Sequence, residues 1–139
     1  MQIDTTTDFG KRVERRLRDE QVIWLTTAGQ DGTPQPSPVW FLWEGEAALI
    51  FSKPNTPKLR NIARNAKVSL HFDSDGRGGN IVVLTGEARI VEPTPTVAEI
   101  PTYITKYAEG IKRMGSTPEQ MAAEYSQAIR VTPTDVRGH

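Results

Sequence analysis

Cysteine is absent from the 139 residues, and histidine occurs only twice, as His71 and His139. The lack of cysteine excludes disulfides, iron–sulfur clusters, thiolate zinc sites and cysteine nucleophiles. Two histidines make a histidine-rich metal site unexpected, so no metal site is predicted. The motifs G-x-S-x-G, H-E-x-x-H, the Walker loop and a G-x-G-x-x-G before a helix are also missing, so a bound cofactor is expected to carry any reaction.

Net charge and long apolar runs are missing as well. Lysine and arginine number 17, as do aspartate and glutamate, so no net field attracts nucleic acid or an anionic membrane. No apolar run approaches the roughly 20 residues that cross a bilayer, and the start MQIDTTTDFGKR lacks the apolar core of a signal peptide. The sequence therefore predicts a soluble, cytoplasmic protein that binds neither nucleic acid nor membrane. A single domain over residues 1–139 fits the length, and the low apolar fraction of 37% favours stabilisation by association.

The centre of the chain is predicted to form a hairpin. Gln35 to Trp43 and Ala47 to Ser52 are β-rich runs separated only by a three-residue turn, residues 44–46. Pro36 and Pro38 cannot donate ladder hydrogen bonds, so the first half of this hairpin is expected at a sheet edge or bulge. Its backbone would then be free to meet something other than a neighbouring strand.

The hairpin leads into a helix whose start resembles an anion site. Thr56 is predicted as the N-cap, and Pro57 suits the first helical position. Unpaired amides, the helix dipole, the Ser52 hydroxyl and the Lys58 ammonium would all favour a negative charge, for which phosphate is the obvious candidate. Ser52 and Lys53 each have two predicted roles. Ser52 either contacts the anion or closes the strand-end turn, and Lys53 either reaches the anion or is simply exposed.

Both faces are apolar from Val39 onward, where Val39, Phe41 and Trp43 alternate with Trp40 and Leu42. One face is expected on the core and the other under a ligand or a partner chain. We interpret the two tryptophans as packing residues rather than as stacking partners for a cofactor ring.

The remaining elements follow from periodicity and turn residues, and about six strands with short early turns predict an α+β fold, a small antiparallel barrel with helices outside it. The expected helices begin at Thr7 or Asp8, at Thr94-Pro95 with a break or restart at Pro101, and at Thr117-Pro118; the further strands are Val22–Thr27, Val68–Phe72, Asn80–Val91 with a bulge at Gly86, and Ala128–Val136.

Three segments together carry a family resemblance: DGTPQPSPVWFLWEGEAALIFSKPNTPKLRNIARNAKVSLHFD, IVVLTGEARIV and AEYSQAIRVTPTDVRGH. They resemble the pyridoxamine 5'-phosphate oxidase-like (PNPOx-like) split β-barrel superfamily of flavin and deazaflavin proteins. The run PQPSPVWF followed by FSKPNTPKLRN is the most specific part, and it is similar to the F420-dependent flavin/deazaflavin oxidoreductases of the B group. The chain lacks the histidine-rich segments of haem-degrading relatives and the arginine- and histidine-bearing substrate motif of the founding oxidase.

The resemblance implies a homodimeric six-stranded split barrel with two cofactor sites at the subunit interface. Lys58 matches the lysine that pairs with the cofactor phosphate, and Ser52, Lys53, Thr56 and Pro57 are its neighbours. The strand carrying Gln35, Ser37, Pro38 and Val39 matches the one that lies along the deazaflavin or isoalloxazine ring.

The expected activity is an F420-dependent reduction of a small molecule, with hydride passing to an electron-poor double bond of an enone or quinone. Alternatives are the same barrel with FMN, and a protein that binds F420 or FMN without turnover. No residue is identified as the proton donor. The basic first helix is either a solvated face or a site where Lys11, Arg12, Arg15 or Arg16 binds the polyglutamate tail of F420.

Overall fold

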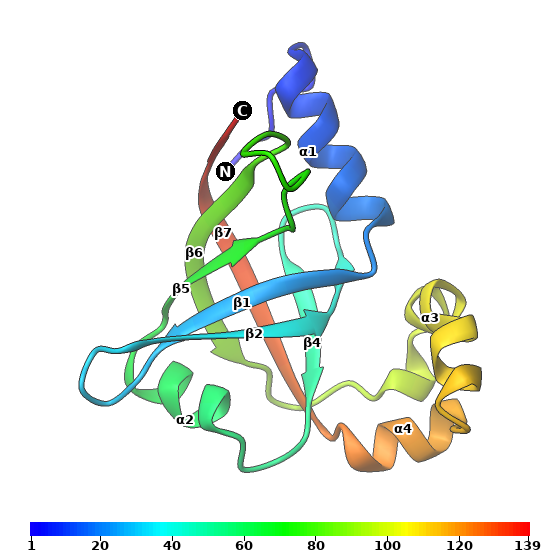
Figure 1. Cartoon of the computed structure of the whole chain (residues 1–139). Helices are drawn as coiled ribbons and strands as arrows, with labels where there is room; N and C mark the ends of the chain where they lie inside the picture. Colours follow the sequence, from blue (N-terminus) through cyan, green and yellow to red (C-terminus); the bar gives the residue numbers. More distant parts are fainter.

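The computed structural model describes residues 1–139 as one antiparallel sheet with helices at its ends and along one side (Figure 1). None of the helices is both long enough and apolar enough to cross a lipid bilayer. The elements are α1 (Asp8–Asp19), β1 (Val22–Ala28), β2 (Pro34–Trp40), β3 (Leu42–Trp43), β4 (Ala48–Ser52), α2 (Pro57–Arg64), β5 (Lys67–His71), β6 (Val82–Ile90), the 3-10 helix η1 (Val97–Glu99), α3 (Pro101–Arg113), α4 (Pro118–Glu124) and β7 (Gln127–Gly138).

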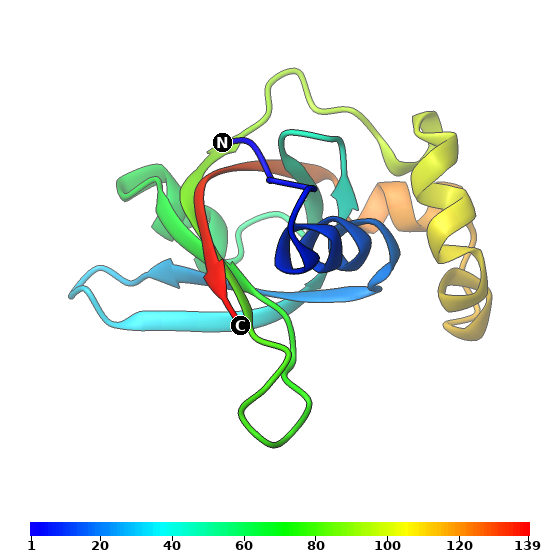
Figure 2. The same cartoon turned by 90° about the horizontal axis from the view of Figure 1, so that it is seen from above.

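The sheet curls into a barrel because its two edges are consecutive parts of one run of chain. The strand order is β2-β1-β5-β6-β7-β4-β3, and only Phe41 separates the edge strands β2 and β3 in the sequence. Figure 2 shows the resulting ring of strands from above, with α1 across its opening. The predicted α+β class and antiparallel barrel are confirmed. Six strands were expected where seven are found, since Phe41 divides one predicted strand in two.

This division also corrects the predicted hairpin. Only Leu42 and Trp43 pair with β4, opposite Leu49 and Ala48, whereas all of β2 pairs with β1. The chain thus pairs with β1 before Phe41 and with β4 after it.

The break at Phe41 arises from a hydroxyl inserted between two strands. The Phe41 N–H donates to Tyr107 Oη at 2.8 Å, and that hydroxyl lies 2.7 Å from the carbonyl oxygen of Gln21. The Phe41 carbonyl accepts from Lys106 Nζ at 2.8 Å and also lies 2.8 Å from Tyr107 Oη. The register of β1 with β2 would pair Gln21 with Phe41 next. Tyr107 therefore replaces a ladder bond at the point where the pairing of the chain passes from β1 to β4.

Prolines determine which backbone hydrogen-bonding groups the unpaired edge of β2 presents. The Gly29 N–H donates to the Thr33 carbonyl at 2.8 Å, so these two residues form a hydrogen-bonded pair. In an antiparallel ladder, hydrogen-bonded and non-hydrogen-bonded pairs alternate, so the odd-numbered residues of β2 are the ones that bond to β1. Pro34, Pro36 and Pro38 occupy the alternate positions, whose carbonyls point away from β1. The predicted edge position is confirmed, and the edge presents acceptors without N–H donors along these prolines.

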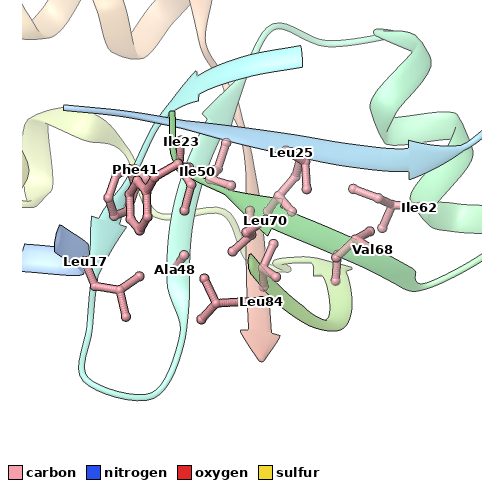
Figure 3. Packing of buried hydrophobic residues seen from close by; sticks show 14 of the residues in the cluster. Leu17, Ile23, Leu25, Phe41, Ala48, Ile50, Ile62, Val68, Leu70 and Leu84 are labelled. Carbon is pink, nitrogen blue, oxygen red and sulfur yellow. The ribbon is translucent and has the colours of Figure 1, made fainter. Parts of the chain in front are cut away.

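One hydrophobic core fills the barrel and continues into the helices at its two ends (Figure 3). Val13 and Leu17 of α1 are fully buried at one end, and Leu59 and Ile62 of α2 close the other. Figure 1 shows these two helices at opposite ends of the barrel. The predicted start of α1 is confirmed, with the Thr7 side chain accepting from the Gly10 N–H.

A second core lies between the outer face of β4 and the helices α3 and α4, where Phe51 packs against Tyr103 of α3. This core covers the face that carries Trp40 and Leu42, which we expected under a ligand or a partner chain. Trp40 stacks on Tyr107 with ring centroids 4.4 Å apart. Most of the cover therefore comes from the chain's own helices, where it was expected from outside the chain, but Trp40 also lines a cavity.

Two further predictions have opposite outcomes. Gly86 lies at a register shift between β6 and β7, where an added Cβ would be 2.2 Å from the Thr132 carbonyl oxygen, so the predicted bulge is confirmed. The helix start at Thr94-Pro95 is wrong, because the helical turn η1 begins at Val97 and α3 begins at the proline of the predicted restart, Pro101.

We expect Tyr107→Phe to destabilise the fold. The change leaves the Phe41 N–H and the Gln21 carbonyl without their shared partner, which should lower the free energy of unfolding by about 1–3 kcal/mol in urea titrations. Tyr103→Phe, one turn earlier in the same helix, is the matched control, because no side-chain hydrogen bond joins the Tyr103 hydroxyl to the chain. Equal losses in the two variants would contradict the role given to Tyr107.

Candidate functional site

A cavity of about 410 Å³ opens between β2, the end of β4, the start of α2 and the α3–α4 pair. In Figure 1 these elements meet in the lower half of the molecule. The cavity has a cationic corner and an apolar wall. Its lining residues are Pro38, Val39, Trp40, Phe51, Ser52, Lys53, Thr56, Lys58, Tyr103, Met114, Met121 and Tyr125.

The cationic corner is centred on Lys58, in the first turn of α2. Its side chain is half-buried, and no carboxylate forms an ion pair with it. Burial lowers the pKa of Lys58 below the ordinary lysine value of 10.5. The dipole of α2 also disfavours a cation at this end of a helix. An ammonium held here against both effects is chemically suited to an anion bound in the cavity.

The start of α2 is open to a ligand because Thr56 does not cap it. The Thr56 hydroxyl lies 3.0 Å from the Ser52 hydroxyl, which donates to the Lys53 carbonyl at 2.8 Å. No side-chain cap reaches the helix start, and the backbone N–H of Lys58 has no acceptor in the chain. Ser52 therefore closes the strand-end turn, which was one of its two predicted roles, while an N–H and an ammonium remain available to an anion.

A buried amide fixes the cationic corner relative to β2. Asn61 of α2, 3% exposed, donates to the Thr27 hydroxyl at 2.9 Å and to the Gln35 side-chain oxygen at 2.8 Å. Its own oxygen accepts from Arg64 at 2.7 Å. Gln35 thus acts as a tie between strand and helix, and its amide is not among the groups that line the cavity.

The other predicted site residues divide in the same way. Pro38, Val39, Ser52, Lys53, Thr56 and Lys58 line the cavity together, whereas Gln35, Ser37 and Pro57 do not. Lys53 is exposed, and its Nζ lies 5.6 Å from the ring centroid of Tyr125 at the end of α4.

The apolar wall was missed by the sequence analysis. Tyr103, Met114, Met121 and Tyr125 come from α3, α4 and the residues next to them, more than forty positions after Lys58. No motif marks these residues, and their helical spacing is that of ordinary packing residues. Only Trp40 had been singled out, and it combines packing on Tyr107 with a place in the cavity.

A second hollow, of about 600 Å³, lies on the outer face of the sheet and holds none of the candidate site residues. Hydroxyl groups of Thr26, Ser69 and Thr85 lie in neighbouring positions of β1, β5 and β6 there. Trp24 and His71 continue this face, with parallel rings 6.1 Å apart. Figures 1 and 2 draw no helix across the outer face of β1 and β5, and Thr26, Ser69 and Thr85 are half-buried there, so this face of the sheet is open.

The basic helix α1 is partly structural. Arg16, 6% exposed, donates to the carbonyls of Asp73 and Asn80 and packs over the Phe72 ring. Arg12 donates to the Asn80 side chain. Two of the four basic residues proposed for a polyglutamate tail therefore serve the fold, and Figure 1 places their helix at the barrel end away from α2.

Comparison with known proteins identifies the fold family. The sequence model described as Pyridoxamine 5'-phosphate oxidase matches residues 9–139. No curated protein is similar enough in sequence to count as a match.

Three solved structures show how widely this fold is used. A conserved hypothetical protein from Mycobacterium tuberculosis has a TM-score of 0.71 at 22% identity, over 91% of this chain and 81% of that chain. A protein named F420 Reductase has a TM-score of 0.66 at 24% identity, over 89% and 94%. The haem storage protein HutZ from Vibrio cholerae has a TM-score of 0.63 at 14% identity, over 99% and 95%. At these identities the likeness concerns the fold.

We expect Lys58→Met to stabilise the ligand-free protein at neutral pH. Methionine keeps an apolar stem and removes both the buried charge and its unfavourable position at the helix start, for a gain of about 0.5 kcal/mol after solvent screening of this half-exposed group. Chemical unfolding measures the change. A clear loss of stability would contradict the view that this ammonium is strained without an anion.

The pH dependence of stability tests the same unfavourable effect of the Lys58 charge in a second way. Since the folded protein holds the Lys58 proton more weakly than the unfolded chain does, stability should rise as the pH approaches 10.5 from below. Lys58→Met should show a smaller rise over the same pH range.

Proposed function

The chain belongs to the pyridoxamine 5'-phosphate oxidase family, and from this premise we propose that it is an F420-dependent oxidoreductase that reduces a small conjugated molecule. The proposal rests on one observation above all. A half-buried lysine without an anionic partner lies at an uncapped helix start and lines a cavity whose α3 and α4 residues are mostly apolar. A phosphorylated, ring-bearing cofactor matches both halves of such a cavity.

The residues present fit this cofactor. Lys58 and its backbone N–H would hold the phosphate, and Lys53 adds a second positive charge at the cavity. The free edge of β2 would meet the ring at Pro38, where carbonyl acceptors without competing donors suit a ring N–H. When bound in its reduced form, the deazaflavin supplies a hydride.

The chain's own contribution is then to position the reactants and to exclude water. Asn61 holds the phosphate-binding helix against β2 through Thr27 and Gln35, so the two parts of the cofactor site move together. The wall from α3 and α4 would shield the reacting face from solvent.

FMN is the second candidate, because the matching family carries the name of an oxidase and both cofactors present a ring and a phosphate. A third possibility is binding of either cofactor without turnover. Neither of the two histidines lines the cavity, so the site offers no imidazole to a haem.

We also propose that a second copy of the chain covers the open outer face of β1, β5 and β6. The centre of this face carries half-buried, uncharged hydroxyl residues beside Trp24. Lys67 and Glu87, directly paired across β5 and β6, put both charge signs at one side of it, which suits a self-complementary contact about a two-fold axis.

Titration of F420 tests the cofactor proposal. Lys58→Met should weaken F420 binding by about 10- to 100-fold, because one charge-assisted hydrogen bond to phosphate is lost. Lys112→Met removes an exposed lysine of α3 outside the cavity and should bind as the wild type does. Unchanged binding by the Lys58 variant would remove the phosphate assignment.

The same titration with FMN separates the candidates. Tight FMN binding without affinity for F420 would reverse their order. Hydride transfer to menadione, followed by the cofactor's absorbance, separates an enzyme from a protein that only binds its cofactor.

The dimer proposal predicts that Ser69→Arg produces a monomer. The change places a long charged side chain in the middle of the open face, where a partner would have to bury it. Light scattering after gel filtration should give the mass of a dimer for the wild type and for Thr5→Arg, an exposed control position before α1. A monomeric wild type would refute the proposal.

A further inference from the structure

Tyr103 carries a hydroxyl that the chain leaves without a hydrogen-bond partner, although only 1% of the residue is exposed. Every fully enclosed side-chain nitrogen and oxygen in the structure does have a partner. The Tyr103 hydroxyl is therefore not fully enclosed. Among the larger hollows of the molecule, Tyr103 lines only the cavity described above, so this cavity is the space assigned to its hydroxyl.

Tyr107 lies one turn later in α3, in the same surroundings, and its hydroxyl is hydrogen-bonded within the chain. The two rings lie 4.8 Å apart between centroids. The Tyr107 hydroxyl bonds to the backbone of Phe41 and Gln21 and leaves no free capacity for a ligand. The unpartnered hydroxyl is thus a property of Tyr103 and not of the helix, and a buried polar group of this kind is normally satisfied by something.

We propose that the Tyr103 hydroxyl donates a hydrogen bond to the carbonyl oxygen of the hydride acceptor, which makes the acceptors of this site flat, uncharged carbonyl compounds of the quinone or cyclic enone type. The inference deepens the proposed function and rests on it. It assigns a catalytic residue that the sequence analysis did not find.

The surroundings of Tyr103 match this class of substrate. Trp40, Met114, Met121 and Tyr125 give the wall an apolar surface, and no carboxylate lines the cavity. Met114 is 53% exposed, so a flexible thioether lies between the cavity and solvent. Methionine and aromatic side chains adapt to flat apolar molecules of different outlines. The two cations of the cavity, Lys53 and Lys58, are assigned to the cofactor.

A donor in this place has a defined chemical task. When a conjugated carbonyl compound takes up a hydride at carbon, the displaced electron pair moves to the carbonyl oxygen, where a positioned donor stabilises it. Burial raises the pKa of Tyr103, so its proton stays on the tyrosine. Tyr103 therefore acts as a hydrogen-bond donor, and the proton that completes the reduction comes from water.

Two ligands of the same outline test the proposal without cofactor. Menadione carries two carbonyl groups, and 2-methylnaphthalene is its hydrocarbon counterpart. In equilibrium dialysis, Tyr103→Phe should bind menadione about 5- to 10-fold more weakly than the wild type and should bind 2-methylnaphthalene equally well. Tyr107→Phe, corrected for its folded fraction, should bind both ligands as the wild type does.

In the F420-loaded protein, Tyr103→Phe should lower kcat for menadione reduction by at least about tenfold while the affinity for F420 stays the same. Failure of the wild type to bind menadione, equal menadione binding by Tyr103→Phe, or a loss of F420 affinity in that variant would each overturn the inference. Menadione binding that depends on Tyr103 in a protein without affinity for F420 would uphold the carbonyl site and refute the proposed cofactor.

Discussion

The hydroxyl of Tyr107 is the contact on which the rest of the architecture depends. The run from Pro34 to Trp43 pairs with β1 up to Trp40 and with β4 from Leu42, with a break in the pairing at Phe41 itself. Tyr107 supplies the break by taking up the Phe41 N–H and offering its proton to the Gln21 carbonyl, so the polar groups freed from the ladder stay paired. Because Tyr107 belongs to α3, the contact at the closure of the barrel also fixes the position of that helix.

This coupling explains why the cavity has walls from such distant parts of the sequence. Tyr107 is also the stacking partner of Trp40, and Tyr103 lies one turn earlier in the same helix. At the other side, Asn61 ties α2 to Gln35 at the opposite end of β2. The strand is therefore held at one end by α3 and near its other end by α2, and the cavity lies between these two attachments.

The sequence predicted the parts of this arrangement that depend on local chemistry. The Thr56-Pro57 helix start, the proline-marked edge and the Gly86 bulge each follow from what one residue type can or cannot do with its backbone. The break at Phe41 could not be predicted, because it is caused by a side chain more than sixty residues away. The apolar wall escaped prediction for a related reason: a methionine on a helix has the same pattern whether it faces a core or a cavity.

Gln35 has a structural role that its match by position did not indicate. It lies on the expected strand, yet its amide bonds to Asn61 and not to the cavity, and Ser52 likewise closes a turn. Polar groups that have found partners within the chain leave little for a ligand. By that criterion the Lys58 ammonium and the Tyr103 hydroxyl stand apart, since both line the same cavity without a polar partner in the chain. A fold that satisfies its enclosed polar atoms throughout yet leaves these two open keeps them for something it does not itself contain.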